Sequence, residues 1–147
     1  MQLYFAYGSN LSTSQMKERC CRPKPLEVGC LKRYRLDFTH YSHTWKGGVA
    51  DVVEDPDYEV WGLVYELSMK DLHRLDDYEG YPDIYTRFQT SIKAQLGSIS
   101  NVWVYTVVKK KNFIPPTKAY IELIKSSAVK LVFPDTYCSY LDMIETR

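Results

Sequence analysis

The segment Tyr4–Leu11, with the sequence YFAYGSNL, carries the first residues that could do chemistry. A short apolar run, Tyr4–Tyr7, stops at Gly8-Ser9-Asn10, and a helix is predicted to start directly afterwards. Glycine allows another group to approach the backbone closely, while serine and asparagine favour a turn. Consecutive backbone N–H groups beside a helix N-terminus suit an anion such as a carboxylate. The pattern predicts an anion-binding turn, although a turn that only connects two elements has the same local signature.

A cluster of carboxylates near the middle of the chain offers a second set of reactive groups. Asp76, Asp77 and Glu79 crowd the end of a helix predicted to begin after Ser68. The negative end of the helix dipole disfavours carboxylates, and neighbouring like charges raise a carboxyl pKa. Glu79 stands at the boundary before Gly80, where it can turn inward toward a cavity walled by tyrosines. A carboxyl of raised pKa in such a cavity suits proton transfer, whereas an acidic surface cluster is the alternative.

The remaining reactive side chains do not form a recognisable site. None of the three histidines belongs to a metal-spaced pair, the four cysteines lack metal-ligand spacing, and no serine lies in a nucleophile elbow. We therefore expect neither a metal nor a cofactor. Cys20, next to Arg19 and Arg22, is either a thiol of lowered pKa or an inert buried cysteine. The run Lys109–Lys111 is interpreted as a solvated strand end rather than a binding patch.

Length and composition restrict the classes of function. A chain of 147 residues can bury one core, and we expect a single domain over residues 1–147. The net charge of +1 gives no electrostatic basis for binding nucleic acid or an acidic membrane. No apolar run reaches the length of a membrane span, and the cysteine pattern suggests a reducing, cytoplasmic setting. The thirteen tyrosines can build a core or line a polar cavity.

The elements that must position these groups are mostly strands in the first two-thirds of the chain. Apolar alternation predicts strands at 4–7, 28–38, 49–53, 59–67, 85–95 and 101–109, with Asp55-Pro56-Asp57 as a hairpin turn. Helices are predicted after Ser12, with Gln15 as its capping-box partner, after Ser68, after Pro115-Pro116-Thr117, and from about Asp135. Together they predict an α+β fold, a small mixed β-barrel with flanking α-helices.

Several motifs together resemble the γ-glutamylcyclotransferase family. Their order and spacing are similar to those of the family over nearly the whole chain. The most specific combination is YGSN at Tyr7–Asn10 with LDDYEG at Leu75–Gly80. The other motifs are RLDF (35–38), TWKGGVAD (44–51), EVWGLVYEL (59–67), the helix start at 115–120 and FPDTYCSYL (133–141). The resemblance implies a small β-barrel with flanking helices, in agreement with the predicted elements.

The resemblance also implies an intramolecular reaction of a small γ-glutamyl substrate, without metal or cofactor. The substrate's α-amine attacks its own γ-carbonyl carbon and releases 5-oxoproline with a free amino acid or amine. Glu79 matches the family's catalytic glutamate and would move a proton from the attacking amine to the leaving nitrogen. The N–H groups of the turn would hold the α-carboxylate, and tyrosine hydroxyls would orient Glu79 or the substrate. The implied substrate-binding residues are Tyr4, Tyr7, Gly8, Ser9, Asn10, Leu11, Tyr85, Tyr105 and Tyr120.

The chain departs from the family pattern at a few positions. The segment from Glu79 to Tyr85 is one residue shorter than in animal members, and Ser127-Ala128 replaces a Gly-Ala pair. The loops expected to face the leaving group, 38–47 and 110–116, are variable. Three functions stay open: a cyclotransferase for γ-glutamyl amino acids, one for γ-glutamyl amines or a biosynthetic γ-glutamyl protecting group, and a non-catalytic carboxylate-binding domain. The expected partner is a small-molecule substrate, bound by a monomer or homodimer.

Overall fold

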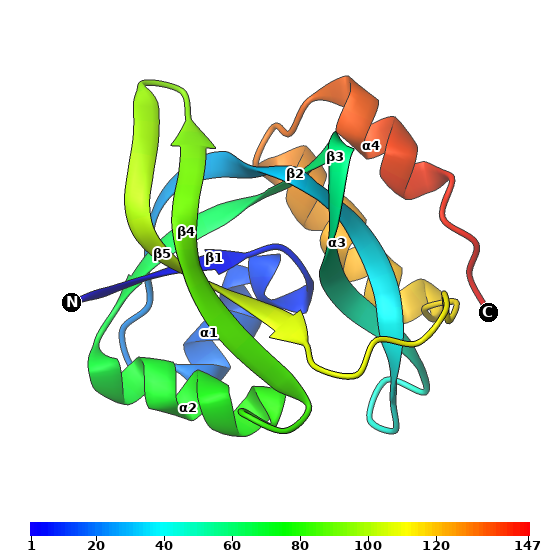
Figure 1. Ribbon diagram of the computed structural model, residues 1–147, viewed down its shortest axis with the longest axis horizontal. Helices are drawn as coiled ribbons and strands as arrows, with labels where there is room; N and C mark the ends of the chain where they lie inside the picture. The colour runs from blue at the N-terminus through cyan, green and yellow to red at the C-terminus, as the bar shows by residue number, and fades with distance from the viewer.

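Residues 1–147 form a closed five-stranded β-barrel in the computed structural model (Figure 1). The strands are β1 (Gln2–Ala6), β2 (Lys24–Ser42), β3 (Gly47–Leu67), β4 (Tyr85–Ala94) and β5 (Gly97–Val107). They follow the order β1-β3-β2-β4-β5 around the barrel. A parallel β1–β5 pair closes the circle, while the other neighbouring strands are antiparallel. The mixed barrel confirms the predicted α+β fold class.

The two longest strands, β2 and β3, form one hairpin whose turn lies at residues 43–46. The predicted turn at Asp55-Pro56-Asp57 is wrong, because β3 runs through these residues. The pairing jumps there: Lys32 pairs with Glu59 and Tyr34 with Glu54, so residues 55–58 bulge out of the ladder. Proline has no N–H to give to the ladder, and a bulge accommodates it without ending the strand. The apolar alternation continues on both sides of the bulge, and both parts of β3 pair with β2.

Short helices pack around the barrel: η1 (Ser9–Leu11), α1 (Thr13–Arg19), α2 (Met69–Glu79), α3 (Lys118–Lys130) and α4 (Asp135–Asp142). Three predicted helix starts are confirmed, because the side-chain oxygens of Ser12, Ser68 and Thr117 each accept the N–H of the residue three positions later. The predicted reciprocal bond from Gln15 is wrong. The Gln15 side chain donates to Ser9 and Asn10 instead, which ties α1 to the turn before it.

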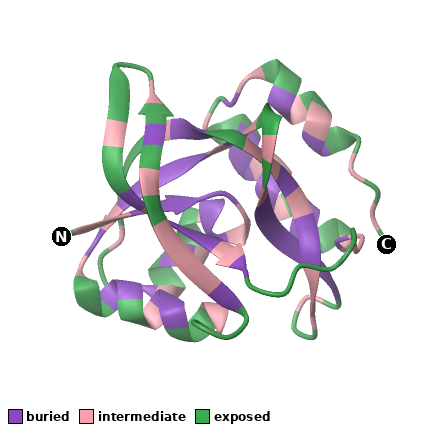
Figure 2. Ribbon diagram, in the orientation of Figure 1, coloured by how far each residue is buried: buried purple, intermediate pink, exposed green.

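One cluster of buried apolar residues fills the molecule, and Figure 2 shows buried residues along the strands and on the inner faces of the helices. Tyrosines contribute both to this core and to a cavity described below. The buried tyrosines are Tyr4, Tyr7, Tyr65, Tyr85, Tyr105, Tyr120 and Tyr137. None of the helices is both long enough and apolar enough to cross a membrane.

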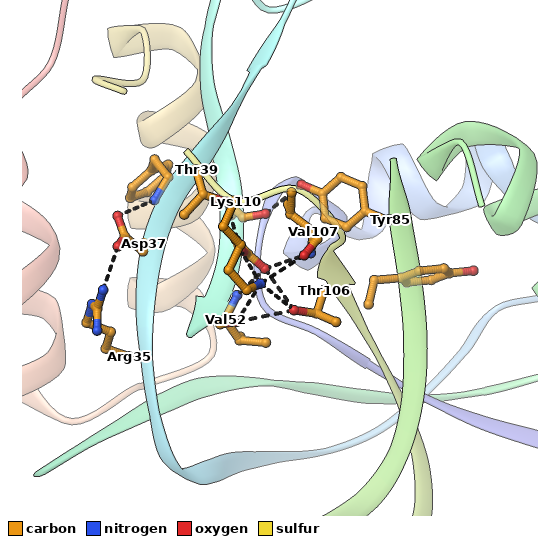
Figure 3. Close-up of polar contacts among 12 residues, drawn as sticks. Arg35, Asp37, Thr39, Val52, Tyr85, Thr106, Val107 and Lys110 are labelled. Carbon is orange, nitrogen blue, oxygen red and sulfur yellow. Dashed lines mark hydrogen bonds and ion pairs between the residues drawn. The ribbon is translucent and has the colours of Figure 1, made fainter. Parts of the chain in front are cut away.

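A fully buried carboxylate, Asp51, joins β3 to the neighbouring elements. Its oxygens accept hydrogen bonds from Thr39 Oγ1 (2.7 Å), Val52 N (2.8 Å), Thr106 Oγ1 (3.1 Å), Val107 N (2.9 Å) and Lys110 Nζ (2.7 Å) (Figure 3). Lys109 and Lys111 are exposed, as expected for a solvated strand end, but Lys110 is the cation that pairs with Asp51. Strands β2, β3 and β5 therefore meet at one carboxylate, next to Ala50.

Candidate active site

A cavity of about 550 Å³ lies where η1, the end of α2 and the β2–β3 hairpin meet. Its deep wall is built from buried residues of five elements, namely Tyr4, Tyr7, Ala50, Tyr85, Tyr105 and Tyr120. Its exposed rim includes His43, Thr44, Asp77, Tyr78 and Ile84. The residues predicted for the site all line this cavity except Leu11. The cavity thus has a closed aromatic floor with hydroxyl groups and an open side toward solvent.

Glu79 is the last residue of α2, and its carboxyl faces the cavity. Gly80 ends the helix in the left-handed conformation (φ of 68°), which glycine adopts most easily. Burial raises the pKa of Glu79 to about 7, with the Asp76 charge adding to the rise and the Arg19 charge opposing it. No hydrogen bond contributes to this pKa. Glu79 is therefore a partnerless carboxyl that can carry or release a proton near neutral pH.

The two aspartates beside Glu79 have different surroundings. Asp76 is buried and accepts two hydrogen bonds from Arg87, at 2.8 and 3.0 Å, and one from the Tyr105 hydroxyl at 2.7 Å. Asp77 is exposed at the cavity rim and does not contribute to the pKa of Glu79. Both aspartates were expected to raise the pKa of Glu79, and only Asp76 does so. The three carboxylates that the sequence predicted as one cluster thus have different positions. Asp76 is bonded inside the protein, Asp77 lies at the exposed rim, and Glu79 faces the cavity.

The turn after β1 presents Gly8, Ser9 and Asn10 to the cavity. The N–H of Leu11 donates to the Gly8 carbonyl at 3.0 Å, and Leu11 is buried away from the cavity. Leu11 is therefore not available to bind a ligand in the way that the sequence suggested. A Cβ atom at Gly8 would lie 3.1 Å from the Ala50 Cβ and 3.2 Å from the Tyr120 hydroxyl. The close approach that requires glycine is thus made by β3 and α3.

The cavity tyrosines differ in whether their hydroxyl protons are already used. The hydroxyls of Tyr7, Tyr85 and Tyr105 donate to the Tyr105 carbonyl, the Ala50 carbonyl and Asp76 respectively. The oxygens of Tyr4 and Tyr120 accept, from the Asn10 amide at 2.9 Å and from the Ala50 N–H at 3.0 Å. Since an accepting hydroxyl keeps its own proton, Tyr4 and Tyr120 can still donate to a ligand.

The tyrosines do not orient Glu79 in the way that the family resemblance suggested. None of the hydroxyls of Tyr85, Tyr105 and Tyr120 donates a hydrogen bond to its carboxyl. They contact Ala50 and Asp76 instead. Burial raises the pKa of all three hydroxyls, so they remain protonated. Their contribution at the cavity wall is shape and neutral hydrogen-bonding capacity.

Sequence reasoning missed two parts of the cavity. Arg19, at the end of α1, lines it and donates from Nη1 to the Asn10 side chain at 3.1 Å, whereas the sequence suggested a role beside Cys20. Cys20 is the inert alternative, because burial raises its pKa to about 12. The backbone of Ala50 was the second omission, since no side-chain pattern reveals that its N–H and its carbonyl oxygen each bind a tyrosine hydroxyl. The segment 38–47, which was predicted to be a loop, is the tip of the β2–β3 hairpin, and it lines the cavity through His40–Trp45.

Comparisons with known proteins agree with this architecture. The sequence matches the family described as "Gamma-glutamyl cyclotransferase, AIG2-like" over residues 4–122. Proteins named gamma-glutamylcyclotransferase from Bos taurus and Homo sapiens are each 32% identical over 148 residues, covering 97% of this chain and 78% of theirs. A solved structure named gamma-glutamyl cyclotransferase has a TM-score of 0.93 at 31% identity, covering 99% of this chain and 89% of that chain. The matched range contains every residue that lines the cavity.

Proposed function

Because the chain belongs to the γ-glutamyl cyclotransferase, AIG2-like, family, we propose that it cyclises a γ-glutamyl group and releases 5-oxoproline with a free amino acid or amine. The observation that carries this proposal is the Glu79 carboxyl, which has no hydrogen-bond partner and a pKa raised to about 7 in a cavity that also contains the Gly8–Asn10 turn. One cavity thus offers a proton carrier and an anion-binding turn. The reaction needs both.

The first task of the site is to hold the substrate in a folded conformation. The nucleophile and the electrophile are parts of one molecule, so most of the rate gain comes from bringing the α-amine within reach of the γ-carbonyl carbon. We assign the substrate α-carboxylate to the backbone N–H groups of Gly8, Ser9 and Asn10. The floor formed by Tyr4, Tyr7 and Tyr105 would shape the bend of the chain between the two reacting ends.

The second task is proton transfer by Glu79. As a carboxylate, it would take a proton from the substrate α-ammonium and free the amine to attack. It would then give that proton to the leaving nitrogen as the C–N bond breaks. The ring nitrogen loses a second proton when it becomes the amide of 5-oxoproline, and this proton leaves with the released amine as its ammonium. Glu79 is then again the carboxylate with which the cycle began. A pKa near neutrality suits both halves of this cycle.

The third task is to stabilise the oxygen that becomes negative when the amine adds to the carbonyl. Hydrogen-bond donors fixed in advance at such an oxygen are among the largest contributors to catalysis. Among the buried tyrosines of the cavity wall, Tyr120 and Tyr4 are those whose hydroxyl protons are not already donated within the protein. We assign this role to Tyr120, with Tyr4 as the second donor. The Ala50 N–H aligns the Tyr120 oxygen from the β3 side.

The domain organisation, the cellular location and the partner of the protein are proposed from simpler observations. We propose a single domain, because one buried cluster contains residues from the first strand to the last helix. All four cysteines are free, and Cys21 is exposed, which supports a reducing cytoplasm. The substrate is a small molecule, acted on by a monomer or homodimer.

The decisive test is incubation with matched γ-glutamyl amino acids and γ-glutamyl amines, with 5-oxoproline measured by mass spectrometry. We expect 5-oxoproline from at least one class, and the preferred class identifies the leaving group. The N-acetylated form of the same substrate should give no product, because its nucleophile is blocked. Release of the leaving group from the acetylated compound would indicate hydrolysis and contradict the proposal. Tight binding of every compound without turnover would favour the non-catalytic carboxylate-binding alternative.

A substrate whose α-carboxylate is converted to the α-amide tests the turn separately. The turn's N–H groups would then lose their charged partner, so kcat/KM should fall, mostly through a higher KM. The control is the same modification on the carboxylate of the leaving amino acid. Equal kcat/KM for the α-acid and the α-amide would contradict the proposal that the Gly8–Asn10 turn binds the substrate α-carboxylate.

A further inference from the structure

We infer that Arg19 is a positioning residue for the proposed reaction, which links the carboxylate-binding turn to the end of α2 and supplies the positive charge that the Glu79 carboxylate needs. This inference rests on the proposed function and adds a residue to it. Arg19 is the only lysine or arginine among the residues that line the cavity. Its contacts with residues other than Glu79 hold its side chain in the cavity without an ion pair to Glu79.

Two contacts hold the guanidinium group of Arg19. Its Nη1 donates to the Asn10 side-chain oxygen at 3.1 Å, and its central carbon lies 4.7 Å from the centre of the Tyr78 ring. Asn10 belongs to the turn after β1, and Tyr78 immediately precedes Glu79 on α2. A planar guanidinium can hydrogen-bond at its edge and stack on a ring with its face, which an ammonium group does poorly. Arg19 therefore connects the two halves of the candidate site.

The backbone around Arg19 is fixed by another buried carboxylate. Asp71, on α2, accepts the N–H groups of Cys21 at 3.0 Å and Arg22 at 3.1 Å, directly after Arg19. Asp71 is itself placed by Ser68, whose hydroxyl oxygen accepts the Asp71 N–H. The end of α1 is thus fastened to the start of α2. The position of Arg19 is consequently defined by backbone contacts as well as by its own side chain.

The charges around Glu79 are unbalanced without Arg19. The titratable groups that face the cavity are Tyr4 of β1, Tyr7 of the following turn, Arg19 of α1, His40, Tyr41 and His43 of the β2–β3 hairpin, Asp77 and Tyr78 of α2, Tyr85, Tyr105 and Tyr120, with Asp76 behind Tyr105. The Asp76 charge is already paired with Arg87. Burial, His43 and Lys111 lower the pKa of His40, which favours its neutral form at neutral pH. Arg19 is therefore the permanent cation of the cavity.

Arg19 acts on Glu79 through its charge and not through a hydrogen bond. This distinction matters because a bidentate ion pair would hold the carboxylate and lower its basicity. The guanidinium donates to Asn10 and stacks on Tyr78, and none of its N–H groups donates to Glu79. It therefore favours the ionised carboxylate through its charge and leaves the carboxylate oxygens free for the substrate ammonium. The same charge lowers the pKa of the Tyr4 and Tyr120 hydroxyls, against the stronger effect of their burial.

The test compares the pH dependence of kcat/KM for the parent, Arg19→Gln and Arg19→Lys, with Arg22→Gln as the matched control. Arg22 is exposed, lies three residues later, and does not line the cavity. In Arg19→Gln we expect the acidic inflection to move to higher pH, because the ionised carboxylate has lost its cation. For each pH unit by which the inflection of Arg19→Gln exceeds that of the parent, kcat/KM at low pH should be about tenfold below the parent value. At pH values above the inflections of both proteins, kcat/KM should be nearly unchanged. Arg22→Gln should superimpose on the parent.

Arg19→Lys separates the charge from the shape of the guanidinium. It should keep the inflection near its parent position while kcat falls several-fold, since the edge contact to Asn10 and the stacking on Tyr78 are weakened. This variant also keeps the test available if Arg19→Gln fails to fold. A lowered kcat/KM in Arg19→Gln at every pH, with an unmoved inflection, would assign Arg19 a merely structural role. A rise in KM alone would make it a substrate-binding residue. Either result overturns the inference.

A measurement without turnover keeps this inference separate from the proposed function. The Glu79 carboxyl can be titrated by ¹³C NMR in the free protein, with the Glu79→Gln variant used to assign its signal. We expect its midpoint to be higher in Arg19→Gln than in the parent and to be unchanged in Arg22→Gln. Identical midpoints in the parent and Arg19→Gln contradict the inference. Absence of 5-oxoproline from the parent, with the midpoint still shifted, would instead contradict the proposed function alone.

Discussion

Asp51 and Glu79 are two carboxylates inside the same small protein, and their surroundings are opposite. Asp51 is completely buried and accepts five hydrogen bonds, one of them from Lys110. Glu79 lies at the wall of an open cavity and accepts none, while burial raises its pKa to about 7. A charged group removed from water is costly unless donors replace the lost solvation. The donors at Asp51 therefore replace its lost solvation and fix its position, whereas Glu79 has no such partners and can exchange its proton.

The contrast also explains which property each residue controls. Every donor to Asp51 comes from a different position on β2, β3, β5 or the segment after β5, so its loss would affect how these elements meet. Nothing in the protein depends on a hydrogen bond to Glu79. The position of Glu79 is set by the helix end at Gly80 and not by its own side chain. Substitutions at the two sites should therefore separate activity from stability.

Glu79→Gln should give the largest effect on activity. General acid–base groups typically contribute about 10²–10⁴ in rate, and glutamine keeps the shape of the side chain while it loses the proton. We expect kcat for 5-oxoproline formation to fall within that range. The circular dichroism spectrum and the urea midpoint at pH 8 should equal or exceed those of the parent. Near-parent turnover would show that another group transfers the proton.

Asp51→Ala should give the largest effect on stability. Removing one partner of a buried pair typically costs about 3–5 kcal/mol, because the other charge and its donors lose their acceptor. Urea unfolding at pH 7 measures the loss. Lys110→Met should cost less than Asp51→Ala, since four donors to Asp51 remain and the Lys110 side chain is 36% exposed. Equal stability of parent and Asp51→Ala would contradict the structural role assigned to this network.

The pH dependence of activity distinguishes Glu79 from an ordinary glutamate. The carboxylate form is the base, so kcat/KM should fall as the pH decreases through about 7 rather than through the ordinary value of 4.5. Below the inflection the decrease should be about tenfold per pH unit. A rate profile over pH 4–9 with the preferred substrate measures this directly. An acidic inflection near 4.5 would mean that burial does not perturb Glu79 in solution.

The same pKa predicts the sign of a change in stability. A carboxyl whose folded-state pKa is raised binds its proton more tightly in the folded state. The resulting stabilisation is therefore fully present below about pH 4.5 and is lost as the pH rises through about 7. Urea midpoints of the parent relative to Glu79→Gln should decline across this window. A parallel pH dependence for the two proteins would contradict the raised pKa independently of any kinetic measurement.

Tyr105→Phe should give the smallest effect. It removes one hydrogen bond to Asp76, which keeps both bonds from Arg87. A loss of about 1 kcal/mol in the free energy of unfolding is typical for one such bond. Its hydroxyl proton is already committed to Asp76, so kcat should change less than in Tyr120→Phe, whose proton is free. A greater loss of kcat in Tyr105→Phe than in Tyr120→Phe would reverse the assignment of the oxyanion donor.

Sequence reasoning succeeded where the signal is local. Ser12, Ser68 and Thr117 begin helices because a side-chain oxygen caps its own next turn, and Gly80 ends α2 for an equally local reason. It failed where partners come from distant segments. The segment around Pro56 was interpreted as a turn because its pairing with β2 on both sides is not visible in the sequence. Lys110 is exposed as predicted, but its ion pair with Asp51 of β3 was not predicted. Arg19 could not be assigned because its neighbours Asn10 and Tyr78 are joined only by the fold.

The parallel β1–β5 pair that closes the barrel also has a consequence for how the protein acquires its site. It brings Leu3 beside Val102 and Tyr4 beside Trp103, and the Tyr7 hydroxyl reaches the Tyr105 carbonyl across 98 positions of the chain. Contacts between such distant positions form slowly, since a long loop must close before any of them is made. During synthesis, a nascent chain lacks the cavity floor until β5 has been made, and it lacks Tyr120 until α3 follows. We expect catalytic competence to emerge late and in one cooperative step of folding, so that incomplete chains bind no substrate.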